Sequence, residues 1–145
     1  MSNNAPAPHH HVAPDALTPA QIESKVESAA IGKATMPKLK LFVLAMFAGA
    51  FVALGAAFFT VVMGDASLGF AVQRLLGGLV FCLGLELVLL CGAELFTGNA
   101  LMVLGKASGK IGWRGIVYNW AMVWLGNFAG ALLMVALVFG SNLQG

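Results

Sequence analysis

The chain has 145 residues, of which 59% are hydrophobic and 10% are charged, and its formal net charge is +2. Soluble domains carry about 25% charged residues, so this composition, with a mean hydropathy of +0.87, excludes an ordinary soluble protein. It predicts an integral membrane protein with one domain at most. The net charge is too small to suggest a nucleic-acid partner.

The first segment, residues 1–17, is rich in Pro, Ala, His and Asn. It lacks the basic start and apolar core of a signal peptide, and its composition predicts a disordered tail. The three adjacent histidines His9, His10 and His11 are interpreted as a solvated run rather than as a metal site.

An amphipathic helix is predicted for residues 18–36. Thr18 suits the N-cap and Pro19 suits the first helical position. Ile22 and Val26 then continue an apolar stripe at helical spacing. We expect this helix to lie at the membrane surface or to pack on a neighbouring subunit.

Residues 37–145 form the predicted transmembrane domain. The uncharged segments 41–63 and 116–139 are each long enough to cross roughly 30 Å of hydrocarbon. The apolar region 69–105 would be about 55 Å long as one straight helix, which is too long for one span and too short for two. We therefore expect an all-α bundle with three crossings, in which the second crossing consists of two half-helices broken at about residues 91–98.

The break is the most informative feature of the sequence. We expect residues 70–90 to form the first half-helix and Cys91-Gly92 to break it, and one of Thr97, Gly98 and Asn99 to cap a second that ends near Lys106. In lipid, irregular backbone survives only where protein covers it or where it lines a cavity, and such breaks mark substrate paths. The free amides of a half-helix attract anions. The alternative is a helix kink held by neighbouring helices, without transport.

Apolar and hydroxyl side chains around the break fit a selective pore. The Thr97 hydroxyl can donate to an anion beside the bulky Phe96, a combination that favours selectivity over open flow. Phe81 and Leu85 are four residues apart and share one helix face. They either narrow a channel there or make ordinary lipid and core contacts.

Two carboxylates lie in or near the broken crossing. Glu86 is deep in the span, where an ionisable residue is a functional-site hypothesis by default; the alternative is a protonated, neutral side chain. Glu94 lies in the break itself. We expect it to hold the loop, either by accepting hydrogen bonds from the loop backbone or by pairing with a cation from elsewhere.

The last predicted span contains polar and small residues with structural roles. Asn119 and Asn127 are interpreted as interhelical hydrogen-bonding residues rather than as pore lining. Gly126 and Gly130 are four apart, a pattern typical of close helix packing.

Basic residues indicate the orientation. They occur before the first span and after the second, which places them on one side of the membrane, and the positive-inside rule makes that side cytoplasmic. The N-terminus is then cytoplasmic and the C-terminus lies outside. The residues concerned are Lys33, Lys38, Lys40, Lys106, Lys110 and Arg114.

No enzyme constellation is visible in the sequence. The spans contain no Ser/His/Asp set, no metal-ligand cluster and no Gly-rich nucleotide loop. We therefore expect neither covalent chemistry nor a cofactor nor a metal site.

These motifs together resemble the formate/nitrite transporter family. The segment Gly92-Ala93-Glu94-Leu95-Phe96-Thr97-Gly98 is similar to the first signature of that family. Further similar pieces are Lys106-Ala107-Ser108-Gly109-Lys110, Asn119-Trp120 and Gly126-Asn127. The resemblance covers roughly residues 18–140.

The resemblance implies a pentamer in the bacterial inner membrane, each protomer holding its own pore in an aquaporin-like fold. It implies transport of small monovalent anions such as formate, nitrite or hydrosulfide, with proton involvement. Phe81, Leu85 and Phe96 match apolar constrictions, and Thr97 matches an anion-contacting residue. Glu86 stands where other members often have an aliphatic residue and is a candidate for tuning selectivity. The positions expected to anchor the loop are Gly92, Glu94, Gly98 and Asn99.

One departure from the family pattern is large. Members have six crossings in two inverted repeats, and this chain resembles the first repeat only, without the pore histidine of the second. We expect it to be a fragment or an incomplete product. Two other functions stay open: a non-conducting structural or assembly protein, and a neutral-solute pore. The sequence Asn99-Ala100-Leu101 differs from the Asn-Pro-Ala that aquaporins place at their half-helix starts.

Overall fold

The computed structural model describes residues 17–141, and this part of the chain is helical without any β-strand. Three helices are long and apolar enough to cross a membrane, which confirms the predicted all-α class with three crossings. The predicted tail lies outside the described residues apart from Leu17. The helices are α1 (Pro19–Ala34), α2 (Lys38–Gly64), α3 (Phe70–Leu90), α4 (Phe96–Asn99), α5 (Met102–Ala107) and α6 (Trp113–Gly140).

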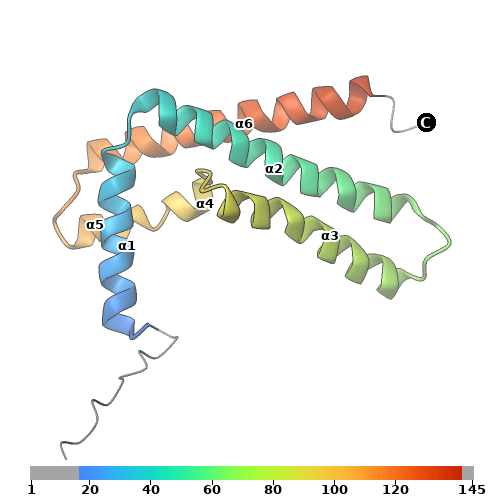
Figure 1. Ribbon diagram of the computed structural model, residues 1–145, viewed down its shortest axis with the longest axis horizontal. Coiled ribbons are helices and arrows are strands. Elements are labelled where there is room, and N and C mark those ends of the chain that lie inside the picture. Colours follow the sequence, from blue (N-terminus) through green and yellow to red (C-terminus); the bar gives the residue numbers. More distant parts are fainter. Residues whose placement is uncertain (1–16, 142–145) are drawn as a thin grey trace, which may run out of the picture.

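The long helices lie side by side, with α2 packed against both α3 and α6 (Figure 1). Glycines permit the close approach of α2 and α6. A Cβ at Gly130 would overlap the carbonyl oxygen of Met46, and one at Gly49 would overlap the backbone of Asn127. Backbone contact without intervening side chains suits membrane helices, which associate through van der Waals packing.

The first helix crosses one end of the bundle, over α5 (Figure 1). It opens with a capping box, in which the Thr18 side chain accepts from the Gln21 amide and the Gln21 side chain accepts from the Thr18 amide. Ala30 is buried against Met102 and Ile116. The helix therefore packs on its own chain. From the sequence we expected it to lie at the membrane surface or to pack on a neighbouring subunit.

The boundaries of the first spanning helix differ from the prediction. Helix α2 begins at Lys38, three residues before the expected start at residue 41, because Pro37 occupies the N-cap and its carbonyl accepts from the amide of Leu41. The charged residues at this end therefore belong to the helix. Hydropathy alone marks only the apolar part of such a helix.

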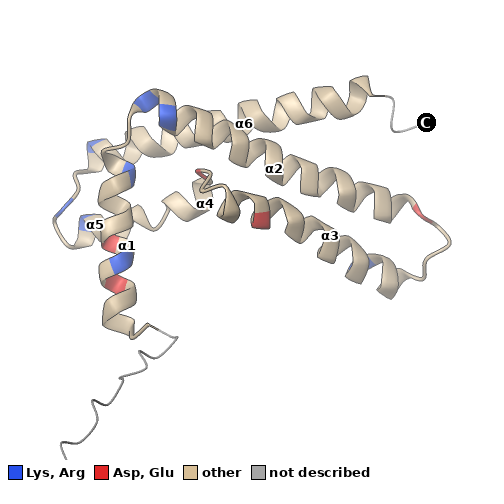
Figure 2. Ribbon diagram, viewed as in Figure 1, with Lys and Arg blue, Asp and Glu red and all other residues tan. Residues whose placement is uncertain are grey.

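Basic residues gather at one end of the bundle, around the α1–α2 junction, α5 and the start of α6 (Figure 2). Asp65 directly follows α2 and Arg74 lies near the start of α3, and the α2–α3 connection is at the opposite end of the bundle (Figure 1). The lysines before the first span and those after the second thus share one end of the molecule, which is the arrangement that the positive-inside rule requires of two intervening crossings.

Candidate functional site: a broken helix held by buried polar side chains

Helix α3 ends at Leu90, and the backbone then leaves the helical path. Gly92 has a φ of +59°, in the left-handed region that glycine adopts without steric penalty. Residues 91–95 form no helix, and α4 follows at Phe96. The second half-helix therefore begins before Thr97, Gly98 and Asn99, where its cap was expected, and a turn at residues 100–101 divides it into α4 and α5.

The cap of α4 comes from another helix. Leu95 stands at the N-cap without a side-chain cap bond. Instead, the Oδ1 of Asn127 on α6 accepts from the Phe96 amide at 3.0 Å. Its Nδ2 donates to the carbonyl oxygens of Glu94 at 2.9 Å and Ala45 at 2.8 Å. One amide side chain thus satisfies loop backbone that would otherwise be unpaired.

A buried ion pair fixes the loop from the other side. The Lys33 Nζ on α1 lies 2.6 Å from the Glu94 Oε2 and 2.8 Å from the Asn99 Oδ1. The Glu94 side chain is only 7% exposed, so its charge is removed from water and depends on this partner. Of the two contacts expected for Glu94, the structure shows the one with a cation.

Asn99 connects this ion pair to the last helix. It is fully buried, and its Nδ2 donates to the Oδ1 of Asn119 at 2.8 Å. Its carbonyl accepts from the Trp120 indole at 2.9 Å, and the Asn119 Nδ2 donates to the Lys33 carbonyl at 3.2 Å. The side chains of Asn99 and Asn119 thus tie the short helices to both α1 and α6.

A second ion pair binds α1 to the loop between α5 and α6. The Lys110 Nζ in the loop before α6 lies 2.6 Å from the Glu27 Oε2. Hydrogen bonds from Lys110 and Ser108 lower the pKa of Glu27 below its ordinary value. Helix α1 is therefore attached by ion pairs, at two positions along its length, to the loops that precede and follow the short helices.

The start of α4 carries free backbone donors. Within the described residues, the amides of Thr97 and Gly98 donate to no acceptor. Both residues are exposed. These are two of the four amides that every helix start leaves without an internal partner. Both lie at the exposed start of α4, and no buried side-chain polar atom of the described part lacks a partner.

The structure separates the predicted constriction residues. Phe81 is 42% exposed and its ring stacks edge-on against Phe59, whereas Phe96 is half-buried against the Trp120 ring. Leu85 is half exposed on the same face of α3 as Phe81. Phe81 and Leu85 thus lie on an open surface.

Glu86 is also exposed on α3. It forms no hydrogen bond or ion pair with any residue from 17 to 141. At 100° per residue it points away from Gly84 and Val88, which are buried on that helix. The structure therefore assigns it no partner.

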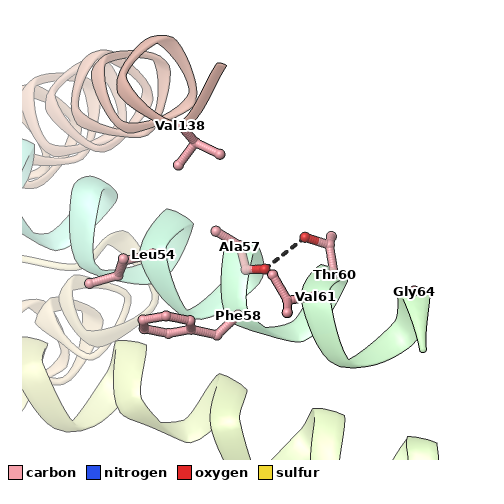
Figure 3. Close-up of a pocket in the computed structure, with 7 residues that line it drawn as sticks. All are labelled: Leu54, Ala57, Phe58, Thr60, Val61, Gly64 and Val138. Carbon is pink, nitrogen blue, oxygen red and sulfur yellow. Dashed lines mark hydrogen bonds between the residues drawn. The ribbon is translucent and has the colours of Figure 1, made fainter. Parts of the chain in front are cut away.

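A separate hollow lies where α2 and α6 diverge (Figure 3), with a volume of about 530 Å³. Its lining is mostly apolar, from Leu54 and Phe58 on α2 to Val138 on α6. The Thr60 hydroxyl donates to the Ala57 carbonyl of its own helix at 2.7 Å. This hollow suits apolar groups and does not include the broken crossing.

The chain matches the formate/nitrite transporter family over residues 20–145. The chain belongs to this family. It is 43% identical over 129 residues to the formate channel FocA of Escherichia coli, covering 88% of this chain and 45% of that protein. It is 35% identical over 128 residues to the formate channel FocA of Haemophilus influenzae, with coverage of 88% and 45%.

A solved structure of an FNT family ion channel has a similar fold, with a TM-score of 0.76 at 29% identity. The match covers 85% of this chain and 50% of the solved chain. The chain thus spans about half the length of the formate/nitrite transporter relatives that it matches. It is a multi-pass membrane protein of a family of channels and transporters.

Sequence reasoning missed two residues of the site. Lys33 was considered only as a charge that sets orientation, and Trp120 only as part of a family motif. A usable signal for Lys33 was its place on a helix that also carries buried Ala30, one turn away, because that spacing directs both side chains toward the same neighbour.

Proposed function

We propose that this chain supplies one wall of a pore for small monovalent anions such as formate or nitrite. The observation that carries the proposal is the pair of unpartnered amides at Thr97 and Gly98. They lie at the start of a short helix whose position is set by the buried contacts of Glu94 and Asn127. Rigidly held donors stabilise an anion without reorganising first, as is typical of pore sites built from broken helices.

The neighbouring side chains complete the proposed site. The exposed Thr97 hydroxyl supplies a further donor. Phe96 provides an apolar boundary beside it, and Phe81 with Leu85 provides a second one on α3. An anion that passes apolar side chains loses part of its water, so that fixed donors then decide which ions proceed. Glu86 is proposed to tune this selectivity from its position on α3.

The formate channel relatives support the anion class, because their names state what they conduct. We propose the same class for this chain, within a homo-oligomer, a pentamer by family resemblance. The remaining pore wall comes from sequence equivalent to the other half of the relatives. We also propose that the N-terminus is cytoplasmic in a bacterial inner membrane, from the basic end in Figure 2.

Anion flux into proteoliposomes tests the proposal. We expect osmotic swelling in formate when this chain is reconstituted together with sequence equivalent to the other half of the relatives. Thr97→Ala should reduce the selectivity for formate over other small anions by about tenfold, because a hydrogen bond to a charged group contributes about 1.5–3 kcal/mol. Phe96→Ala should leak other small anions. Thr60→Ala is the control, because its hydroxyl bonds only to its own helix. Unaltered flux in both site variants would show that the assignment is wrong.

The second candidate is a non-conducting assembly protein. The observation that favours it is the exposure of Phe81, Leu85 and Thr97 on an open surface of the chain. Intact oligomers that show no swelling in formate would select this function.

A further inference from the structure

The basic end of α6 carries an aromatic and apolar stripe that no part of the function above uses. Arg114, Tyr118, Ala121 and Leu125 follow one another at intervals of four, three and four residues, so they share one face of the helix. All four are exposed. The buried residues of α6, such as Val123, lie on the opposite face.

A lysine from α2 joins the charged end of this stripe. The Lys38 Nζ lies over the Tyr118 ring, 5.3 Å from its centroid. Such a cation–π contact attracts the ammonium group to the ring face. Lys38 and Arg114 form no ion pair with any carboxylate of the described chain. Both positive charges are therefore available to a ligand, and the Tyr118 ring fixes the position of the Lys38 ammonium group.

The order of residues along the stripe matches the order of groups in a phospholipid. The charges stand at the first turns of α2 and α6, at the basic end of the bundle in Figure 2. From Arg114 to Leu125 the helix rises about 16 Å, close to half of the roughly 30 Å hydrocarbon core. Beyond the charges the stripe is apolar.

We propose that Lys38, Tyr118 and Arg114 form a binding site for the headgroup of an anionic phospholipid, whose acyl chain lies along Ala121 and Leu125. The lysine and arginine bind the phosphate, and the tyrosine ring holds the lysine at the depth where the headgroup lies. The apolar stripe distinguishes a lipid from a free phosphate ion, which has no tail to bind there. This site is independent of the proposed pore, because it shares no residue with it.

Quenching of the protein's tryptophan fluorescence by brominated lipids tests the proposal, since Trp113, Trp120 and Trp124 all lie in the first half of α6, which also carries the stripe. The whole protein is reconstituted in phosphatidylcholine vesicles that contain brominated phosphatidylglycerol or, for reference, brominated phosphatidylcholine. We expect preference for phosphatidylglycerol. Lys38→Gln and Arg114→Gln should each lower it about fivefold, because one cation near an anionic surface contributes about 1 kcal/mol.

Three further arms separate a defined site from diffuse charge attraction. Tyr118→Leu should lower the preference although it removes no charge, and Tyr118→Phe should retain it because the ring remains. Lys25→Gln is the control, an exposed lysine on α1 away from the stripe. Added inorganic phosphate should not displace the lipid. Equal effects of Lys25→Gln and Lys38→Gln, no effect of Tyr118→Leu, or no lipid preference at all would overturn the proposal.

Discussion

The Lys33 Nζ and the Glu94 Oε2 lie 2.6 Å apart although 61 residues separate them in the sequence. This ion pair joins the helix outside the predicted spans to the loop that interrupts the second crossing. Because the Glu94 side chain is nearly buried, removing the lysine would leave a charge without a partner in a medium that stabilises it poorly. The pair therefore couples the position of α1 to the shape of the break.

Lys33→Met should destabilise the protein by about 3–5 kcal/mol, the usual range for breaking a buried ion pair by removing one partner. Reversible unfolding in mixed detergent micelles measures this. Lys25→Met is the control, because Lys25 is exposed on the same helix. In a double-mutant cycle, the loss of unfolding free energy in the variant that combines Lys33→Met and Glu94→Leu should be smaller than the sum of the losses in the two single variants. Additive values would show that the two side chains do not interact.

Asn127→Leu should destabilise the loop by at least about 2 kcal/mol, since it leaves backbone groups at Phe96 and Glu94 without partners and each such group costs about 1–3 kcal/mol. Hydrogen exchange at the Phe96 amide should also accelerate. Thr60→Val is the control, a polar side chain in a span that bonds only to its own helix. Equal stability of the two variants would contradict the role given to Asn127.

Gly130→Ala should separate α2 from α6, because the added Cβ would overlap the Met46 carbonyl. Overpacking of this kind costs about 1–3 kcal/mol. The matched control is Gly78→Ala on α3, where a Cβ meets no atom within 4 Å and the change should be neutral or should stabilise the helix by up to about 1 kcal/mol. Thermal unfolding in detergent compares them, and a Gly130→Ala protein as stable as the parent would refute the close contact.

The attachment of α1 should weaken in acid. The hydrogen bond from Lys110, and then that from Ser108, lowers the pKa of Glu27 below its ordinary 4.5. A lowered pKa means that the stabilisation is complete above pH 4.5 and is lost as the pH falls through the folded-state pKa. Proteolysis within α1 should therefore accelerate as the pH falls below the folded-state pKa of Glu27. Glu27→Gln should remove this pH dependence, and an unchanged profile would exclude Glu27 as its source.

The sequence was sufficient to predict features that depend on local patterns. Three apolar segments gave the three crossings, and the length of the region 69–105 required a break in the second. Thr18 gave the start of α1 because its capping box is a local hydrogen-bond pattern. The family resemblance was confirmed by the match over residues 20–145.

The details of the site depend on distant residues and could not be predicted in the same way. Helix α4 begins at Phe96 instead of at Thr97 to Asn99, because its capping acceptor is Asn127, 31 residues away. The partner of Glu94 is Lys33, on a helix that we expected at the membrane surface or against a neighbouring subunit. The roles of Phe81, Leu85 and Glu86 stay predictions, since these side chains lie on open surfaces of the chain.

The proposed pore requires that the backbone amides of Thr97 and Gly98 bind the transported anion. Amide NMR of the protein in lipid nanodiscs, titrated with formate, detects this binding. We expect saturable proton and nitrogen shifts at these two amides, with little change at Phe96, whose amide donates to Asn127. If the shifts at Thr97 and Gly98 stay constant while formate flux is measurable, the anion passes elsewhere and the proposed site is wrong.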